Sequence, residues 1–268
     1  MRRLNEYSYQ ANLSNFHQQS LIWVNMSNIA QACLSKLFMK HIITLQQIYK
    51  DYPQAGRLHN VLHDINLQIV TGEFVAIVGP SGNGKSTLLN ILTGIDYPSR
   101  GQVNVNGTDL NNLSNDKLTA WRGANVGIVF QFFQLLPTLS LLQNVILPMD
   151  FLGKLNKLQR QERALHLLKL VGLAEEADRL PSQVSGGQQQ RAAIARALAN
   201  DPPLIVADEP TGNLDAATAD SVFNLFAHLR DQGKTLVMVT HNQTLAEAAD
   251  RTLEIRNGRI HADNAVVN

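Results

Sequence analysis

Residues 79–86, which read GPSGNGKS, restrict the possible folds of this chain more than any other segment. They match the pattern G-x-x-x-x-G-K-S, follow an apolar run at 74–78 and precede a stretch with helical spacing at 85–92. Glycines let backbone amides curl around an anionic phosphate, and the amino terminus of a following helix adds a favourable dipole. The context predicts a phosphate-binding P-loop, because a simple glycine turn has no need of the Lys-Ser pair.

This loop supplies side chains as well as backbone amides. We expect Lys85 to contact the β and γ phosphates of a nucleotide. Ser86 can offer its hydroxyl to Mg²⁺, which prefers hard oxygen ligands and retains several waters. The residues expected to bind ATP here are Gly79, Pro80, Ser81, Gly82, Asn83, Gly84, Lys85, Ser86 and Thr87.

Two further apolar runs, at 204–207 and 235–240, have the length of buried strands, and a helical pattern at 217–230 separates them. Strands that alternate with helices in this way indicate a parallel sheet. The expected fold class is therefore α/β, with a P-loop NTPase core of the RecA-like kind.

Other segments predict additions to this core. Short strands at 43–48 and, after a Pro/Gly loop, at 62–69 favour an antiparallel β edge subdomain. Strand signals vanish between 134 and 183, and 159–170 has helical spacing, which predicts an inserted helical subdomain at about 134–184. The dipeptide Asn257-Gly258 near the end predicts a hairpin.

Residues 1–38 differ from the rest, since they are rich in Asn, Gln and Ser. We interpret them as a loosely ordered tail, or as an upstream start with the working nucleotide-binding domain at 39–268. The alternative is an amphipathic helix on a membrane or partner. It would use a weak apolar stripe at Ile22, Met26, Ile29, Cys33 and Leu37.

Composition excludes several classes of function. The formal net charge of +1 gives no basic field for phosphate backbones, so no nucleic-acid partner is expected. Cys33 is the only cysteine, which excludes an intrachain disulfide and a zinc site built on cysteine pairs. No run reaches the roughly 18 apolar residues that a transmembrane helix needs, and no secretory signal is evident. Any transport across a membrane would therefore need another polypeptide. The single cysteine fits a protein of the reducing cytosol best.

Residues 204–209 read LIVADE, an apolar strand that ends in two carboxylates. Ligands of open α/β sheets bind at this carboxyl edge. Asp208 is positioned to hold Mg²⁺ through its water shell, and Glu209 to orient and deprotonate an attacking water. The alternative, a solvated acidic pair, is the weaker interpretation beside a P-loop.

A second glycine-rich segment narrows the class of NTPase. Ser185-Gly186-Gly187-Gln188 precedes a helical run at 189–199, so Ser185 can cap the helix and the glycines permit close approach of a second phosphate group. The stretch VSGGQQQRAAIARAL resembles the signature of ABC ATPases, with Val184 in place of the usual leucine. The resemblance implies that this site closes on ATP held by the opposite subunit of a homodimer.

Other positions match this family one by one over residues 41–261. Tyr52 resembles the aromatic residue that stacks on adenine, and Gln131 the glutamine that senses Mg²⁺ and the γ-phosphate. His241 resembles the switch histidine that contacts the γ-phosphate. The loop that crosses the dimer is matched by Asn213, Leu214 and Asp215, in EPTGNLD.

Two segments look most like the branch of this family that drives lipoprotein release and macrolide export. They read EPTGNLD and GIVFQFFQLLPTLSLLQNVILPM. That branch implies a peripheral ATPase at the cytoplasmic face of the plasma (inner) membrane, which powers export of a lipoprotein, lipid, peptide or drug through a separate permease. By analogy, four apolar residues would help to receive the permease, although each could equally pack the helical subdomain. They are Phe132, Phe133, Leu135 and Leu136.

Three alternatives remain. A non-transport ABC ATPase would carry tandem domains or long coiled-coil insertions, and neither is visible. A division-type ATPase that switches cell-wall hydrolases through a similar permease is not excluded. A P-loop kinase or small-molecule NTPase leaves the SGGQ segment and His241 unexplained. The transported substrate is set by the permease rather than by this chain.

Overall fold

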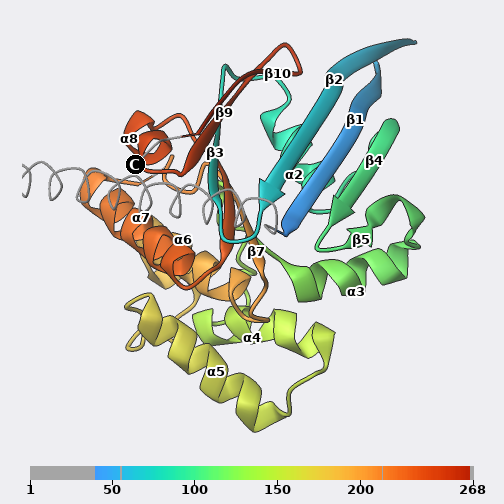
Figure 1. Cartoon of the computed structure of the whole chain (residues 1–268). Coiled ribbons are helices and arrows are strands. Elements are labelled where there is room, and N and C mark those ends of the chain that lie inside the picture. Colours follow the sequence, from blue (N-terminus) through green and yellow to red (C-terminus); the bar gives the residue numbers. More distant parts are fainter. Residues whose placement is uncertain (1–39, 55, 213, 266–268) are drawn as a thin grey trace, which may run out of the picture. The chain divides into compact units, whose positions relative to one another are not determined.

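The computed structural model describes residues 40–54, 56–212 and 214–265 (Figure 1). The chain divides into two units, residues 1–40 and 41–268, and the fold described is that of the second unit. The interpretations of residues 1–38, as a tail or as an amphipathic helix, lie outside the described residues, and so does Asn213.

The central sheet has the strand order β10-β9-β3-β8-β7-β6. Its strands are β3 (Phe74–Val78), β6 (Val126–Val129), β7 (Leu204–Asp208), β8 (Thr235–Val239), β9 (Arg251–Arg256) and β10 (Arg259–Ala265). All neighbours pair in parallel except β9 and β10, which form the hairpin predicted at Asn257-Gly258. The parallel sheet expected from the apolar runs is therefore confirmed.

Both faces of the parallel part of this sheet are covered by apolar cores, which explains why β3, β6, β7 and β8 read as continuous apolar runs. Along β3, Phe74 and Ala76 belong to one core, which also includes residues of four helices: α4 (Leu141–Leu152), α5 (Lys157–Leu170), α6 (Gly186–Ala197) and α7 (Ala216–Asp231). Val75 and Ile77 point the other way, into a core shared with α2 (Lys85–Leu92) and the second sheet. The alternation follows from the period of two along a strand.

The second sheet has the order β2-β1-β4-β5 and is antiparallel throughout, as expected for the edge subdomain. Its strands are β1 (His41–Gln54), β2 (Arg57–Val70), β4 (Arg100–Val105) and β5 (Thr108–Asp109). Figure 1 shows β1, β2 and β4 side by side, with α2 between them and the central sheet. The sequence analysis did not identify β4, although Val103 and Val105 alternate with polar residues there.

Helices lie on both sides of the central sheet (Figure 1). They are α2 (Lys85–Leu92), α3 (Asn115–Asn125), α4 (Leu141–Leu152), α5 (Lys157–Leu170), α6 (Gly186–Ala197), α7 (Ala216–Asp231), α8 (Gln243–Glu247) and the short 3-10 turns η1 (Leu110–Asn112) and η2 (Pro181–Gln183). The fully described stretch 134–183 contains α4, α5 and η2 and no strand, which gives the fold its inserted helical part. Capping boxes at Ser140 and Asn156 start α4 and α5.

Candidate functional site

The P-loop joins β3 to α2, and two of its glycines are required by close packing. A Cβ at Gly79 (φ 138°) would lie 2.1 Å from the carbonyl oxygen of Ile255, and one at Gly84 (φ 93°) 2.7 Å from Leu62 Cδ2. Gly84 is also the N-cap of α2, where no side chain caps the helix. The first backbone amides of α2 therefore remain suited to an anion.

Lys85 is buried, and its ammonium group lies across the loop. Its Nζ donates to the carbonyl oxygens of Gly79 at 2.8 Å and Pro80 at 2.9 Å. Asn83 ties the loop to the β9–β10 turn, because its Oδ1 accepts from the Asn257 amide at 2.6 Å. The positive charge is thus held inside the curve of the loop.

Two predicted catalytic residues meet where β7 and β8 end. Glu209, directly after β7, has a left-handed backbone (φ 45°), which is strained for a residue with a side chain. Its amide donates to the Val239 carbonyl at 2.9 Å, and its Oε1 lies 2.6 Å from His241 Nε2. His241 also lines an open cavity of about 660 Å³ together with Gly79 and Pro80 of the P-loop.

Gln131 joins the same edge of the sheet. A Cβ placed on Gly212 would lie 3.5 Å from Glu209 Oε2 and 3.7 Å from Gln131 Nε2, so both side chains flank this glycine. Gln131 follows β6, which pairs with β7, and the carboxyl ends of parallel strands lie at one edge. The topology therefore brings Gln131, Glu209 and His241 together.

Oxygen ligands suitable for Mg²⁺ are present at this edge. Ser86 is an exposed residue in the first turn of α2, and Asp208 ends β7, a strand that packs against α2. Within the described ranges, no cluster of three or more His, Cys, Asp or Glu residues could hold a metal by itself. The donor set fits an ion that takes one or two protein oxygens and completes its shell with phosphates and water.

The serine-glycine segment forms a separate helix start. Ser185 Oγ accepts from the Gln188 amide at 3.3 Å, and Gln188 Oε1 accepts from the Ser185 amide at 2.9 Å, which confirms the expected cap of α6. A Cβ on Gly187 would lie 2.5 Å from Thr218 Cγ2, so α6 begins against the start of α7. Asp215 in turn caps α7 by accepting from the Thr218 amide at 3.0 Å.

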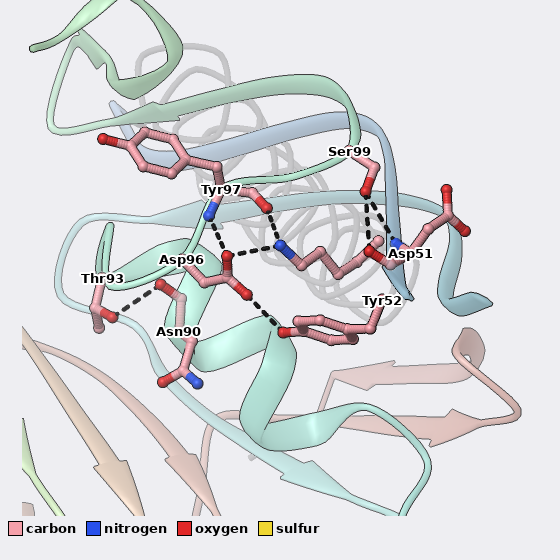
Figure 2. Close-up of polar contacts among 8 residues, drawn as sticks. Asp51, Tyr52, Asn90, Thr93, Asp96, Tyr97 and Ser99 are labelled. Carbon is pink, nitrogen blue, oxygen red and sulfur yellow. Dashed lines mark hydrogen bonds and ion pairs between the residues drawn. The ribbon is translucent and has the colours of Figure 1, made fainter. Parts of the chain in front are cut away.

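Tyr52 lies on β1 and is 36% exposed. Figure 2 shows its hydroxyl pointing to Asp96, where it donates to Oδ2 at 2.5 Å. The Lys50 ammonium lies 4.7 Å from the centre of the Tyr52 ring. Burial and the Asp96 carboxylate raise the pKa of the Tyr52 hydroxyl, and the Thr87 hydroxyl opposes this rise.

The sequence analysis missed Lys50 and Asp96. The sequence offered a weak indication for Lys50, because it stands two residues before Tyr52 on the same strand, and residues two apart lie on the same face of a strand. Asp96 had none, because it comes from a loop after α2.

It also missed Arg196 and Asn144, which shape the loop after β6. Phe133 and Gln134 have left-handed backbones, and Arg196 of α6 donates to both of their carbonyls, to that of Phe133 at 2.7 Å. Burial lowers the pKa of the Arg196 guanidinium. Asn144 of α4 is fully buried and accepts from the Leu136 amide at 2.8 Å.

Apolar side chains remain exposed near this loop. Phe132 is 67% exposed, whereas Leu135 packs against the core. A groove of about 500 Å³ lies between α3 and α4, and Phe151 on its rim is 84% exposed. No helix in the described part of the chain is long and apolar enough to cross a bilayer.

Sequence comparisons relate this chain to known ATP-binding proteins. A family profile described as ABC transporter matches residues 62–212. An uncharacterized ABC transporter ATP-binding protein of Thermotoga maritima is 46% identical over 83% of this chain and 94% of its own length. The macrolide export ATP-binding/permease protein MacB of Sodalis glossinidius is 47% identical over 83% of this chain and 34% of its own length.

Solved structures share the fold. A dimeric post-hydrolysis state of the ATP-binding cassette MJ0796, bound to ADP and Pi, covers 84% of this chain and 99% of its own, with a TM-score of 0.80 and 41% identity. Another dimeric structure of this cassette matches with a TM-score of 0.80 and 42% identity. The family match, the relatives and the cassette fold together show that this chain belongs to the ABC transporter family, as one of its ATP-hydrolysing, ATP-binding proteins.

Proposed function

We propose that two copies of this chain clasp two Mg·ATP at a shared face, hydrolyse the ATP and reopen, and that this cycle drives export through a separate membrane permease. The proposed cargo is a lipoprotein, lipid, peptide or drug. The observation that carries the proposal is that one chain holds two glycine-rich helix starts, at Gly84 and at Ser185, on different helices. The dimeric form of the solved cassettes supports the two-copy arrangement.

In this proposal, residues 79–87 bind the phosphates and Tyr52 stacks on the adenine. Lys85 exchanges its two carbonyl acceptors for phosphate oxygens. The signature residues of the second copy approach the same nucleotide from the other side. The loop that crosses the dimer approaches it next to them. These groups are Ser185, Gly186, Gly187 and Gln188, followed by Asn213, Leu214 and Asp215. The nucleotide-binding domain would be residues 39–268, with its helical subdomain at about 134–184.

Mg²⁺ would be held by Ser86, Asp208 and Gln131. Bound there, the ion would neutralise charge on the β and γ phosphates during transfer. The small number of protein oxygens at this edge supports the assignment, since Mg²⁺ keeps most of its shell for water and phosphate.

Glu209 is the proposed general base. His241 donates from Nε2 to its Oε1 and so leaves Oε2, the oxygen that faces Gly212, to accept a proton from water. The strained backbone of Glu209 supports a functional role, because such strain is retained mainly where the site needs it.

The permease contact is proposed at exposed apolar residues within and next to the helical insertion. The groove between α3 and α4, with Phe151 on its rim, and the exposed Phe132 are suited to receive an apolar helix. Such a contact would hold the chain at the cytoplasmic face of the plasma (inner) membrane. The macrolide export relative, whose name joins an ATP-binding part and a permease, supports export as the direction.

A Glu209→Gln variant tests the catalytic part of the proposal. Nucleotide binding should persist, because the amide keeps the shape of the side chain. Steady-state phosphate release should fall by about 10²- to 10⁴-fold, since the amide cannot take a proton. The exposed Glu162 on α5 offers a matched Glu→Gln control that should keep full activity. Turnover comparable to wild type in Glu209→Gln would reject Glu209 as the base.

A further inference from the structure

We propose that Lys50 and Asp96 are positioning residues that hold the ring of Tyr52 so that only one of its faces is open to the purine base of a nucleotide. The inference rests on the proposed stacking role of Tyr52 and deepens it. Lys50 and Asp96 would thereby contribute to the preference of the site for a nucleoside triphosphate over inorganic triphosphate.

Asp96 fixes the position of the Tyr52 hydroxyl. Asp96 Oδ2 accepts from Tyr52 Oη at 2.5 Å, while Oδ1 accepts from Lys50 Nζ at 2.6 Å and from the Tyr97 amide at 2.7 Å. Figure 2 shows these donors converging on one carboxylate. A carboxylate with its oxygens occupied in this way has little freedom to turn, so the far end of the Tyr52 ring is anchored.

Lys50 occupies one face of the Tyr52 ring. Lys50 is 9% exposed, and besides Asp96 its ammonium donates to the Tyr97 carbonyl oxygen at 2.7 Å. Its Nζ lies over the Tyr52 ring at 4.7 Å from the centroid, within cation–π range. Tyr52 as a whole residue is nevertheless 36% exposed, and in this proposal a base stacks on the ring face away from Lys50.

Helix α2 links Tyr52 and its anchor, Asp96, to the phosphate-binding loop. The amides of Ile95 and Asp96 both donate to the Asn90 carbonyl oxygen, at 2.9 and 3.1 Å, in the last turn of α2. The Thr93 hydroxyl donates to the Asn90 carbonyl oxygen at 3.1 Å in the same turn (Figure 2), and it also contacts the Leu89 carbonyl oxygen at 2.9 Å. Helix α2 therefore begins at the P-loop and ends at the anchor of Tyr52, which sets the spacing between base and phosphates.

The inference is tested with two probes that differ in the base: the non-hydrolysable analogue β,γ-imido-ATP and inorganic triphosphate. Lys50→Met and Asp96→Asn should each weaken the analogue by roughly 3- to 10-fold, the loss expected for about one hydrogen bond. The affinity for triphosphate should not change, because the phosphate loop is untouched. In steady state, KM for ATP should rise while kcat stays constant.

Tyr52→Phe keeps the ring and removes the hydroxyl, which gives a gentler second variant. Its effect on the analogue should be smaller in the Asp96→Asn background than in wild type, because the single acceptor oxygen of asparagine cannot serve Lys50, Tyr97 and Tyr52 as two carboxylate oxygens do. Matched controls are Lys234→Met and Asp201→Asn, which alter a comparable ion pair of 2.8 Å outside the site. Both controls should keep wild-type affinity for both probes.

Tyr52→Ala separates the two levels of the proposal. If it leaves analogue binding unchanged, stacking on Tyr52 is rejected, and the positioning role is rejected with it. If Tyr52→Ala weakens the analogue but Lys50→Met and Asp96→Asn do not, only the positioning role is overturned. Equal losses for both probes in Asp96→Asn would also overturn it, since a purely structural contribution of Asp96 to α2 predicts that result.

Discussion

At the scale of single residues, three charged side chains in and near the site each have several hydrogen-bonding partners. Lys85 has two carbonyl acceptors and Asp96 has three donors, while Arg196 binds two carbonyls of a strained turn. Buried charge is costly unless it is paired, so these arrangements also stabilise the fold. Function and stability are thus coupled at the same positions.

Lys85→Ala should weaken nucleotide binding by roughly 10- to 100-fold, because it removes a charge-assisted contact to the phosphates. The measurement is an equilibrium titration with ATP in the presence of Mg²⁺. The exposed Lys154→Ala is the control for loss of one positive charge elsewhere. Unchanged affinity in Lys85→Ala would contradict the phosphate contact.

The Asp96 carboxylate should contribute pH-dependent stability. Burial alone would raise its pKa, but hydrogen bonds from Lys50, Tyr52 and the Tyr97 amide outweigh burial and lower the pKa below its usual 3.8. A carboxyl group with a lowered pKa in the folded state stabilises the fold above its unfolded pKa, and this contribution is lost as the pH falls through the folded value.

Denaturant unfolding of wild type and Asp96→Asn checks this sign. The difference in unfolding free energy between the two proteins should be largest at neutral pH and should shrink as the pH drops below about 3.8. A difference that stays constant over this range would show that the charge of Asp96 contributes nothing to stability.

At the scale of elements, the start of α6 is packed against the start of α7. Gly187 makes this approach possible, since any Cβ there would collide with Thr218 Cγ2. The neighbouring Gly186 has no such restriction, because its nearest neighbour, the Phe133 ring, would lie 3.7 Å away. Two adjacent glycines of one motif therefore have different physical requirements.

Gly187→Ala should destabilise the protein by about 1–3 kcal/mol through overpacking. Gly186→Ala should be neutral or slightly stabilising, because alanine is favoured over glycine within helices. Adding Thr218→Ser to Gly187→Ala removes the clashing methyl group but keeps the hydroxyl bond to Asp215, and should restore much of the loss. Urea unfolding of the four proteins measures these differences, and equal stability of the two alanine variants would refute the packing argument.

At the scale of the whole molecule, the proposed nucleotide site needs two copies of the chain. The Glu209→Gln variant with saturating ATP and Mg²⁺ should form dimers, because the closed dimer does not reopen when ATP is not hydrolysed. Solution scattering measures the fraction of dimers. Removal of Mg²⁺ with EDTA should return the sample to single copies. Single copies under all conditions, even with a membrane partner supplied, would contradict the shared-face arrangement.

Much of the fold and many positions of the site follow from the order of residues alone. The P-loop, the strand that ends in Asp208 and Glu209, and the cap at Ser185 are local features. Each depends on a few neighbouring residues, on the period of an apolar pattern or on a capping rule. Local patterns in the sequence are therefore sufficient to predict the α/β class, the family resemblance and the positions of these motifs.

Contacts between distant segments were decided only by the tertiary structure. Asp96 reaches Tyr52 across 44 positions, and Arg196 reaches Phe133 across 63. Glu209 and His241 meet because β7 and β8 are neighbours in the sheet, and Gly187 meets Thr218 because α6 packs against α7. Such pairs depend on strand register and helix packing, which arise when the whole core is buried at once, so no local pattern records them.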